Sequence, residues 1–214
     1  AGYHVEQLAV AGLIGLLFGN SPKAIAPWGG TAGLFGTNPV AFAAPRRAAP
    51  PLVIDLSLSK VARGKVMVAA KQGDPIPEGW ALDSAGRPTT DAGAALQGTM
   101  LPMGDAKGAA LVLMVEILAA ALTGARFGFE ASSFFTAEGE PPAVGQFLIA
   151  IDPDVFSGAA FADRLEVLVD AILMQDGTRL PGARRSALRA AAARDGLEVP
   201  GALYEELTAL SATA

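Results

Sequence analysis

The stretch LVIDLSLSKVARGKVMVAAK occupies residues 52–71 and decides the class of fold. Residues 52–56 form a short apolar run typical of a buried strand, and residues 60–71 favour a helix. No Gly-x-Gly-x-x-Gly or Gly-x-x-x-x-Gly-Lys-Ser/Thr motif joins the two, here or elsewhere in the sequence. The sequence therefore predicts a mixed α/β protein without a Rossmann dinucleotide turn or a P-loop.

The same reading extends outward along the chain. Strands are predicted at residues 13–18, 40–44, 52–56 and 146–151. Helices are predicted at residues 5–13, 60–71, 91–97, 107–122, 161–173, 184–194 and 204–210. This pattern indicates an α/β domain at residues 1–155 and a helical segment at residues 156–214 that packs on it.

Three finer expectations concern packing. Strands 52–56 and 146–151 are expected in the interior of the sheet. Helix 107–122 is apolar on every face, so we expect it to be enclosed. The apolar face of helix 161–173 is expected to consist of Phe161, Leu165, Leu168, Ile172 and Leu173.

Composition excludes several classes of protein. Hydrophobic residues make up 51% of the 214 residues, which is ample for a core, and the net charge of -5 opposes a nucleic-acid surface. The absence of cysteine excludes disulfides and thiolate metal sites. The longest apolar stretch, 109–122, is interrupted by Glu116 and is shorter than the roughly 20 residues of a membrane span. We expect a soluble, cytoplasmic protein that binds neither nucleic acid nor membrane.

Two polar clusters could bind an anion. Asp55 and Ser57 stand where a strand ends and precede Arg63, a position where ligands commonly bind, although helix capping also explains the hydroxyls. The sequence from Gly104 to Gly108 precedes the apolar helix, where free N–H groups attract anions. Asp105 would offset that attraction, and a plain N-terminal cap explains the segment nearly as well.

A third cluster surrounds a Pro-Gly turn. It places Arg179, Arg184 and Arg185 close together in sequence, and guanidinium groups match phosphate and carboxylate oxygens, although many such clusters are only solvated. His4 is the only imidazole, so neither a two-histidine metal site nor a metal of any kind is predicted. Its place at the very start of the chain argues against a catalytic role.

Taken together, these segments resemble the malate/L-lactate dehydrogenase family, which includes L-sulfolactate, ureidoglycolate and Δ1-piperideine-2-carboxylate dehydrogenases or reductases. The resemblance runs from Gly12 to Arg185. Its matching stretches are NSP (20–22), APWGG (26–30), FGTNP (35–39), AFAAP (41–45), residues 55–65, IPEGWALD (76–83), GRPTTD (86–91), LPMG (101–104), KG (107–108), LMVEIL (113–118) and LTG (122–124).

The resemblance implies a largely antiparallel sheet with flanking helices, a non-Rossmann nicotinamide-binding domain and a homodimer. It implies hydride transfer between NAD or NADP and a small 2-hydroxy/2-oxo acid or related imino acid, with Thr37 at the substrate. The residues it implies at the cofactor are Asp55, Leu56, Ser57, Arg63, Gly64, Asp105, Arg179, Leu180, Pro181, Gly182, Ala183, Arg184 and Arg185.

Some positions depart from the family pattern. The family's catalytic histidine lies in a Ser-x-His-Phe-Gly type of motif, and Ala1 matches the trailing edge of that motif, so we expect a chain truncated at its start and inactive alone. Asp105 adds a negative charge near the expected phosphates, and Leu58 replaces a hydroxyl residue. The alternative hypothesis is a non-catalytic remnant that serves only as a scaffold or dimerisation module.

Overall fold

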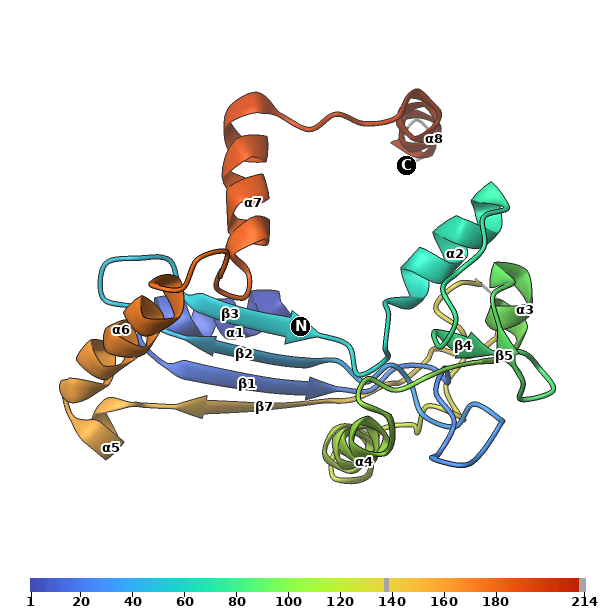
Figure 1. The fold of residues 1–214 in the computed structure, drawn as a ribbon, viewed down its shortest axis with the longest axis horizontal. Coiled ribbons are helices and arrows are strands. Elements are labelled where there is room, and N and C mark those ends of the chain that lie inside the picture. Colours follow the sequence, from blue (N-terminus) through green and yellow to red (C-terminus); the bar gives the residue numbers. More distant parts are fainter. Residues whose placement is uncertain (137–138, 212–214) are drawn as a thin grey trace.

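The computed structural model describes residues 1–136 and 139–211. Its largest element is a four-stranded, fully antiparallel sheet with the order β3-β2-β1-β7 (Figure 1). The strands are β1 (Ile14–Gly19), β2 (Val40–Ala44), β3 (Leu52–Leu56) and β7 (Gln146–Ile151). The predicted mixed α/β fold with an antiparallel sheet and flanking helices is confirmed, and no parallel pair joins two of these strands.

The order of the strands corrects one expectation. Strands β3 and β7, expected in the interior, form the two edges of the sheet. The apolar run of each strand reflects burial on one face and says nothing about the number of neighbouring strands. In β7 the exposed and partly buried residues alternate, with Leu148 among those that face solvent.

Helix α1 (Gly2–Val10) covers one face of the sheet over β1, β2 and β3. Beneath it lie the small side chains of Ala41 and Ala43, both completely buried. They pack with Val5 and Leu17 in a compact core. Small residues at these strand positions let the helix approach the sheet closely, since bulky side chains would hold the layers apart.

The opposite face packs against helix α4 (Asp105–Glu116) and the π-helical turn η1 (Ile117–Ala121) that continues it. Val112 and Val115 of α4 are completely buried in a second core that includes Phe18 of β1. The expectation that this helix is enclosed holds on the sheet side only: Leu113 and Ile117 are about half exposed, at 47% and 52%, which leaves part of the enclosure to a partner or to solvent. The sheet reaches only one side of the helix.

A second lobe follows β3 and contains helix α2, helix α3 and a small sheet in the order β5-β4-β6 (Figure 1). Asp91 caps α3 as predicted, since its side chain accepts a hydrogen bond from Ala94 N at 2.8 Å. Helix α2 begins later than predicted because Lys60 N donates to Leu101 O at 2.8 Å instead. The bounds are α2 (Arg63–Gln72), β4 (Ala81–Leu82), β5 (Pro88–Thr89), α3 (Ala92–Gln97) and β6 (Thr99–Met100).

Four helices follow β7. The third and fourth match the two short helices predicted near the end of the chain, and α8 stands away from the sheet (Figure 1). In α6 the buried residue is Val169, so the expectation that Leu168 and Leu173 face the core was wrong. No helix in residues 1–136 and 139–211 is both long and apolar enough to cross a membrane. The bounds are α5 (Asp154–Ser157), α6 (Ala160–Leu173), α7 (Ala183–Asp195) and α8 (Gly201–Ser211).

Candidate functional site

Thr37 lies in the loop that leads into β2, and its backbone is held on both sides. Thr37 N donates to Ser21 Oγ at 3.0 Å, and the two hydroxyl oxygens are 3.4 Å apart. Leu58 N, from the loop after β3, donates to Thr37 O at 2.8 Å. The segment expected at the substrate is therefore joined directly to the segment expected at the cofactor.

Thr37 opens into a cavity of about 470 Å³. Ser21 and Lys23 line it beside Thr37, and Arg63 reaches it from the start of α2. Arg63 donates from one terminal nitrogen to Lys23 O at 3.1 Å, and its guanidinium carbon lies 5.4 Å from the centre of the Phe135 ring. Burial lowers the pKa of Arg63 from its usual value. The cavity thus combines two cationic side chains with the hydroxyl groups of Ser21, Thr37 and Ser133.

A buried hydrogen-bond network holds the two loops that line this cavity. Glu116, in the apolar stretch of α4, is only 3% exposed. One carboxyl oxygen accepts from Gly128 N at 2.6 Å and from Asn20 Nδ2 at 3.3 Å. The other accepts from Asn38 Nδ2 at 2.7 Å. Asn20 and Asn38 are the immediate neighbours of Ser21 and Thr37, so Glu116 fixes both cavity loops.

The side chains at the end of β3 lie on both faces of the sheet. Asp55 accepts a hydrogen bond from Gly2 N, at the start of α1, at 2.9 Å and forms an ion pair with Arg185 of α7 at 3.5 Å. Leu56 points to the other face of the sheet, because side chains alternate along a strand, and it is partly exposed. Ser57 Oγ lies 3.0 Å from Ser59 Oγ, and Ser59 Oγ donates in turn to Val61 O. Neither hydroxyl caps α2, whose N-cap is Ala62 without a side-chain hydrogen bond, so helix capping by these serines is not what the structure shows.

The loop before α4 contacts the same region. Met103 N donates to Leu58 O at 2.8 Å, which places the start of α4 beside the loop after β3. Gly104 and Asp105 both have positive φ, 65° and 55°, and Asp105 is exposed at the first position of the helix. Asp105, which follows Met103 by two residues, therefore lies near Leu58, and its exposed carboxyl group faces solvent.

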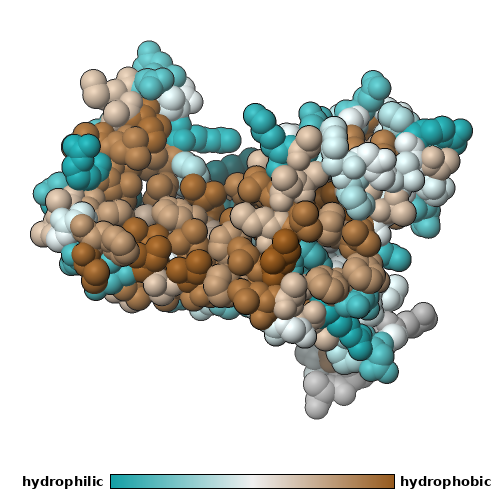
Figure 2. Space-filling model, turned by 90° about the horizontal axis from the view of Figure 1, so that it is seen from below, coloured by the Kyte–Doolittle hydropathy of each residue, from teal (hydrophilic) through white to brown (hydrophobic). Residues whose placement is uncertain are grey.

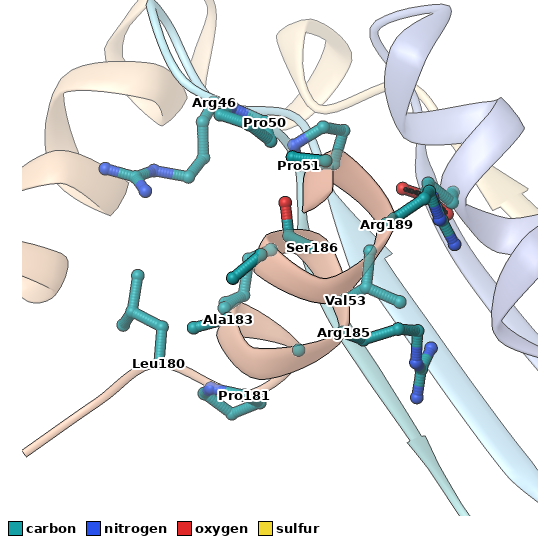
Figure 3. Close-up of a pocket in the computed structure, with 15 residues that line it drawn as sticks. Arg46, Pro50, Pro51, Val53, Leu180, Pro181, Ala183, Arg185, Ser186 and Arg189 are labelled. Carbon is teal, nitrogen blue, oxygen red and sulfur yellow. Dashed lines mark hydrogen bonds and ion pairs between the residues drawn. The ribbon is translucent and has the colours of Figure 1, made fainter. Parts of the chain in front are cut away.

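The arginine cluster forms a separate wall at the start of α7. Gly182 has φ of 79°, and a Cβ at this position would lie 2.7 Å from Val53 O, so only glycine permits this contact with β3. A cavity of about 370 Å³ lies between β3 and α7, with Leu180 and Pro181 at its edge and Ala183 on the helix (Figure 3). Arg46 and Arg185 lie on opposite sides of the start of α7 (Figure 3).

A neighbouring open cavity of about 530 Å³ is lined by Arg179, Arg184 and Arg185. Arg179 and Arg184 are exposed, and neither forms an ion pair among the described residues. Arg185 is held by Asp55. The cluster therefore offers two free guanidinium groups beside one that is anchored to the sheet.

The predicted residues thus fall into two groups that meet at the end of β3. Thr37 and Arg63 line one cavity. Residues 179–185 line two others, and Arg185 among them pairs with Asp55 at the end of β3. Gly64 belongs to neither group, because it lines a hollow on another side of α2 with Trp80.

Sequence reasoning missed several contributors to the site. In the sequence, the Asn20-Ser21-Pro22 turn is recognisable only as a stretch that matches the family pattern, and Glu116 only as a charge in an apolar run. No signal in the sequence links Glu116 to Asn20, 96 residues away.

His4 lines none of these three cavities. It is an exposed residue of α1, and its ring centre is 5.5 Å from that of Tyr3. Within residues 1–136 and 139–211, no three potential His, Cys, Asp or Glu ligands gather into a metal site. The Thr37 cavity and the cavity of Arg179 and Arg184 thus offer hydroxyls and guanidinium or ammonium groups, which suit anionic ligands.

The fold is an antiparallel α/β fold, and the described residues contain no Rossmann turn. Cationic and hydroxyl groups suited to anions lie on both sides of the end of β3. These features define a class of anion-binding α/β proteins that is distinct from the Rossmann class. The model of the malate/L-lactate dehydrogenase family matches residues 1–208. The chain belongs to the malate/L-lactate dehydrogenase family.

Individual relatives agree with this assignment. The chain is 60% identical over 209 residues to a (2R)-3-sulfolactate dehydrogenase (NADP(+)) from Chromohalobacter salexigens, covering 98% of this chain and 62% of that protein. It is 46% identical to a Δ1-pyrroline-2-carboxylate/Δ1-piperideine-2-carboxylate reductase from Pseudomonas aeruginosa, covering 96% of this chain and 62% of that protein.

Solved structures give the same result. The crystal structure of Δ1-piperideine-2-carboxylate reductase from Pseudomonas syringae pv. tomato superposes with a TM-score of 0.90 at 42% identity, covering 98% of this chain and 63% of that one. Sulfolactate dehydrogenase from Methanocaldococcus jannaschii gives 0.87 at 34%, with 97% and 61% covered. The chain thus spans a little over three fifths of the length of these relatives.

Proposed function

We propose that this chain is the cofactor-binding part of an oxidoreductase that transfers a hydride between NAD or NADP and a small 2-hydroxy/2-oxo acid or related imino acid. The observation that carries the proposal is the meeting of two anion-binding groups at the end of β3. The hydrogen bond from Leu58 N to Thr37 O joins the Thr37 loop to the loop after β3, and the ion pair of Arg185 with Asp55 joins α7 to β3. Membership of the malate/L-lactate dehydrogenase family supports the same activity.

Residue roles follow from the two groups. Thr37 contacts the substrate, while Asp55, Leu56 and Ser57 line the nicotinamide cofactor, with Gly64 and Asp105 at its margins. The free guanidinium groups of Arg179 and Arg184 fit the phosphates of such a cofactor, because charge-assisted hydrogen bonds to phosphate are strong and bidentate. The turn from Leu180 to Ala183 and the anchored Arg185 hold those groups in place. Bound nicotinamide supplies the hydride acceptor or donor at carbon 2 of the acid.

Cofactor identity and domain division belong to the proposal. One relative is named as an NADP(+) enzyme, which favours NADP. We assign cofactor binding to 1–155 and propose that 156–214 packs on it to complete the phosphate side. No observation favours the non-catalytic scaffold, so it is not carried further.

Titration calorimetry with NADPH and NADH tests the cofactor site. Changing Arg184 to Ala should weaken NADPH binding about ten- to a hundredfold, since a charge-assisted hydrogen bond contributes roughly 1.5–3 kcal/mol. Arg194→Ala is the matched control, because Arg194 lies at the far end of the same helix and pairs with Asp195. Equal NADPH affinity in the wild type and Arg184→Ala would contradict the assignment.

We also propose that the 214-residue chain shows no turnover alone. Hydride transfer to a 2-oxo acid needs a proton donor at the new hydroxyl oxygen, and the only imidazole is His4, which does not line the Thr37 cavity. The measurement is NADPH oxidation with 2-oxo acids by the wild type and His4→Ala. Turnover that persists in His4→Ala would refute this, and turnover lost there would make His4 the donor.

A further inference from the structure

The two edges of the main sheet differ in how they are protected. At the β3 edge, Gly182 of the turn before α7 packs against Val53 O, and the strand carries the charge of Asp55. The other edge strand, β7, has six residues without a charge, a proline or a glycine. Charges, prolines and covering segments usually keep an edge strand from pairing with another chain. Within residues 1–136 and 139–211, the backbone of β7 is paired only with β1.

The register shows which backbone groups of β7 point away from β1. Asn20 N donates to Gly145 O at 3.2 Å, and this pair continues the register of the β1–β7 ladder by one position. In an antiparallel ladder the hydrogen-bonded pairs recur at every second residue. The odd-numbered residues of β7 therefore bond to β1. The N–H and C=O groups of Gln146, Leu148 and Ala150 point outward, and in the described part of the chain no recorded backbone hydrogen bond uses them.

The surroundings of this edge are apolar on both faces of the sheet. On one face α1 packs on β1, β2 and β3, and Leu148 of β7 is left 45% exposed. On the other face η1 packs against β7, and its Ile117 is half exposed. Figure 1 places β7 at the lower edge of the sheet, and Figure 2, seen from below, shows mostly apolar side chains on that side. An uncharged, apolar edge of this kind suits another uncharged, apolar strand.

We propose that β7 pairs with β7 of a second copy of this chain, antiparallel across a twofold axis at Leu148, so that the two sheets become one. A second copy fits because a twofold axis perpendicular to the sheet brings identical strands together antiparallel, with no like charges opposed. Gln146 then lies opposite Ala150 of the partner subunit, and the three outward residues form about six interchain hydrogen bonds. A shift by one residue would oppose side chains of different faces, and a larger shift would pair fewer outward groups.

Disulfide trapping tests this register, because the 214-residue chain contains no cysteine. Leu148→Cys should form a covalent dimer under mild oxidation, since opposite Cα atoms in such a pair are about 5.5 Å apart, within disulfide range. Gln146→Cys alone is the matched control, because its two copies lie about 13 Å apart along the strands. Gln146→Cys combined with Ala150→Cys should crosslink again. Crosslinking of Gln146→Cys alone, or none with Leu148→Cys, would overturn the register.

Sedimentation velocity measures the dimer itself. The wild type should be dimeric at tens of micromolar. Leu148→Lys should weaken dimerisation at least about tenfold, because it places two like charges opposite each other at the axis. Val68→Lys, at an exposed apolar position of α2, is the matched control and should remain dimeric. A monomeric wild type, or a dimer that survives Leu148→Lys unchanged, would contradict pairing through β7.

Hydrogen exchange in the wild type needs no substitution, so a folding defect cannot imitate its result. The amides of Gln146, Leu148 and Ala150 should exchange at least about tenfold more slowly in the dimer than in the dilute monomer, since pairing removes them from water. The amide of Ile149 is the internal control, because β1 protects it in both states. Equal exchange of the outward amides at high and low protein concentration would refute the proposal, even for a chain that dimerises. None of these measurements depends on the proposed cofactor or substrate.

Discussion

Glu116 shows how one side chain can organise segments that are distant in sequence. It accepts hydrogen bonds from residues 20, 38 and 128 while it is almost completely buried. The sequence places a carboxyl group inside an apolar helix but does not reveal its partners. Those partners come together only when β1, β2 and α4 pack, so no local pattern could predict them.

Replacing Glu116 with Ala should destabilise the protein by about 3–5 kcal/mol, because Gly128 N loses its acceptor and the Nδ2 groups of Asn20 and Asn38 each lose one of two. Chemical denaturation of the wild type and the variant measures the loss in free energy of unfolding. Glu130→Ala is a suitable control, since Glu130 accepts one hydrogen bond, from Phe127 N, at an exposed site. A loss below about 1 kcal/mol, the size of one ordinary hydrogen bond, would show that the network is not needed for folding.

Asp105 is the residue at which the sequence and the proposed cofactor site conflict. Its left-handed backbone, with φ of 55°, is tolerated by Asp and Asn better than by most residues. Asp105→Asn keeps that tolerance and removes the negative charge. We expect NADPH affinity to rise about two- to fivefold, since unit charges about 4 Å apart in water interact by about 1 kcal/mol and salt screens them further.

Calorimetry at low and high salt checks this expectation. The gain should shrink at high salt, because screening already weakens the repulsion in the wild type. Asp74→Asn, an exposed aspartate after α2, should bind NADPH like the wild type. An unchanged affinity in Asp105→Asn at low salt would place Asp105 away from the cofactor phosphates.

At the scale of elements, the sequence predicts which strands and helices exist better than it predicts which of them lie next to one another. The bounds of β2, β3 and β7 agree with the apolar runs, yet β3 and β7 lie at the edges of the sheet. The two-residue strands β4, β5 and β6 leave no periodic signal and were missed. Helix α6 was predicted, but Val169 and not Leu168 is its buried residue, and Arg46 contacts the same helix through Glu166.

That contact should make the docking of α6 depend on pH. Arg46 donates from Nε to Glu166 Oε1 at 3.1 Å and from a terminal nitrogen to Oε2 at 2.6 Å. The hydrogen bond from Arg46 lowers the pKa of Glu166 below its usual 4.5. A lowered folded-state pKa means that the stabilisation is present above pH 4.5 and is lost as pH falls through the folded-state value.

Thermal unfolding of the wild type and Glu166→Gln across this pH range measures the effect. At neutral pH the variant should be less stable by about 1 kcal/mol, the upper range for a surface pair. The difference should narrow as the pH falls below 4.5. Glu205→Gln, at an exposed position of α8, provides the control. A difference that stays constant with pH would show that the side-chain shape, and not the ion pair, matters.

At the scale of the whole molecule, the main surface feature is an apolar face. Figure 2 shows apolar side chains spread over the face on which Figure 1 places β7 and α4. On α4 and η1, Leu113 and Ile117 are about half exposed. The apolar pattern of the helix indicates a partner on each side, and the sheet supplies only one. Contiguous apolar surface of this kind is typical of interaction sites.

We expect this face to drive self-association of the 214-residue chain. Sedimentation velocity over a range of protein concentrations should show dimers or larger species at tens of micromolar. The double substitution Leu113→Ser with Ile117→Ser should shift the distribution toward monomer, because the two residues are four positions apart on one side of the helix. Val10→Ser, at an exposed apolar residue of α1, is the matched control.

The outcomes distinguish specific association through this face from unspecific aggregation of an apolar surface. A defined dimer that the double substitution abolishes, and the Val10 control keeps, would assign the interface to α4 and η1. Open-ended aggregation that both variants reduce would show that burial is unspecific, since any apolar area removed from water contributes about 25 cal/mol per Å². A clean monomer in the wild type would contradict self-association, and the half-exposed side chains of α4 would then be stable in water.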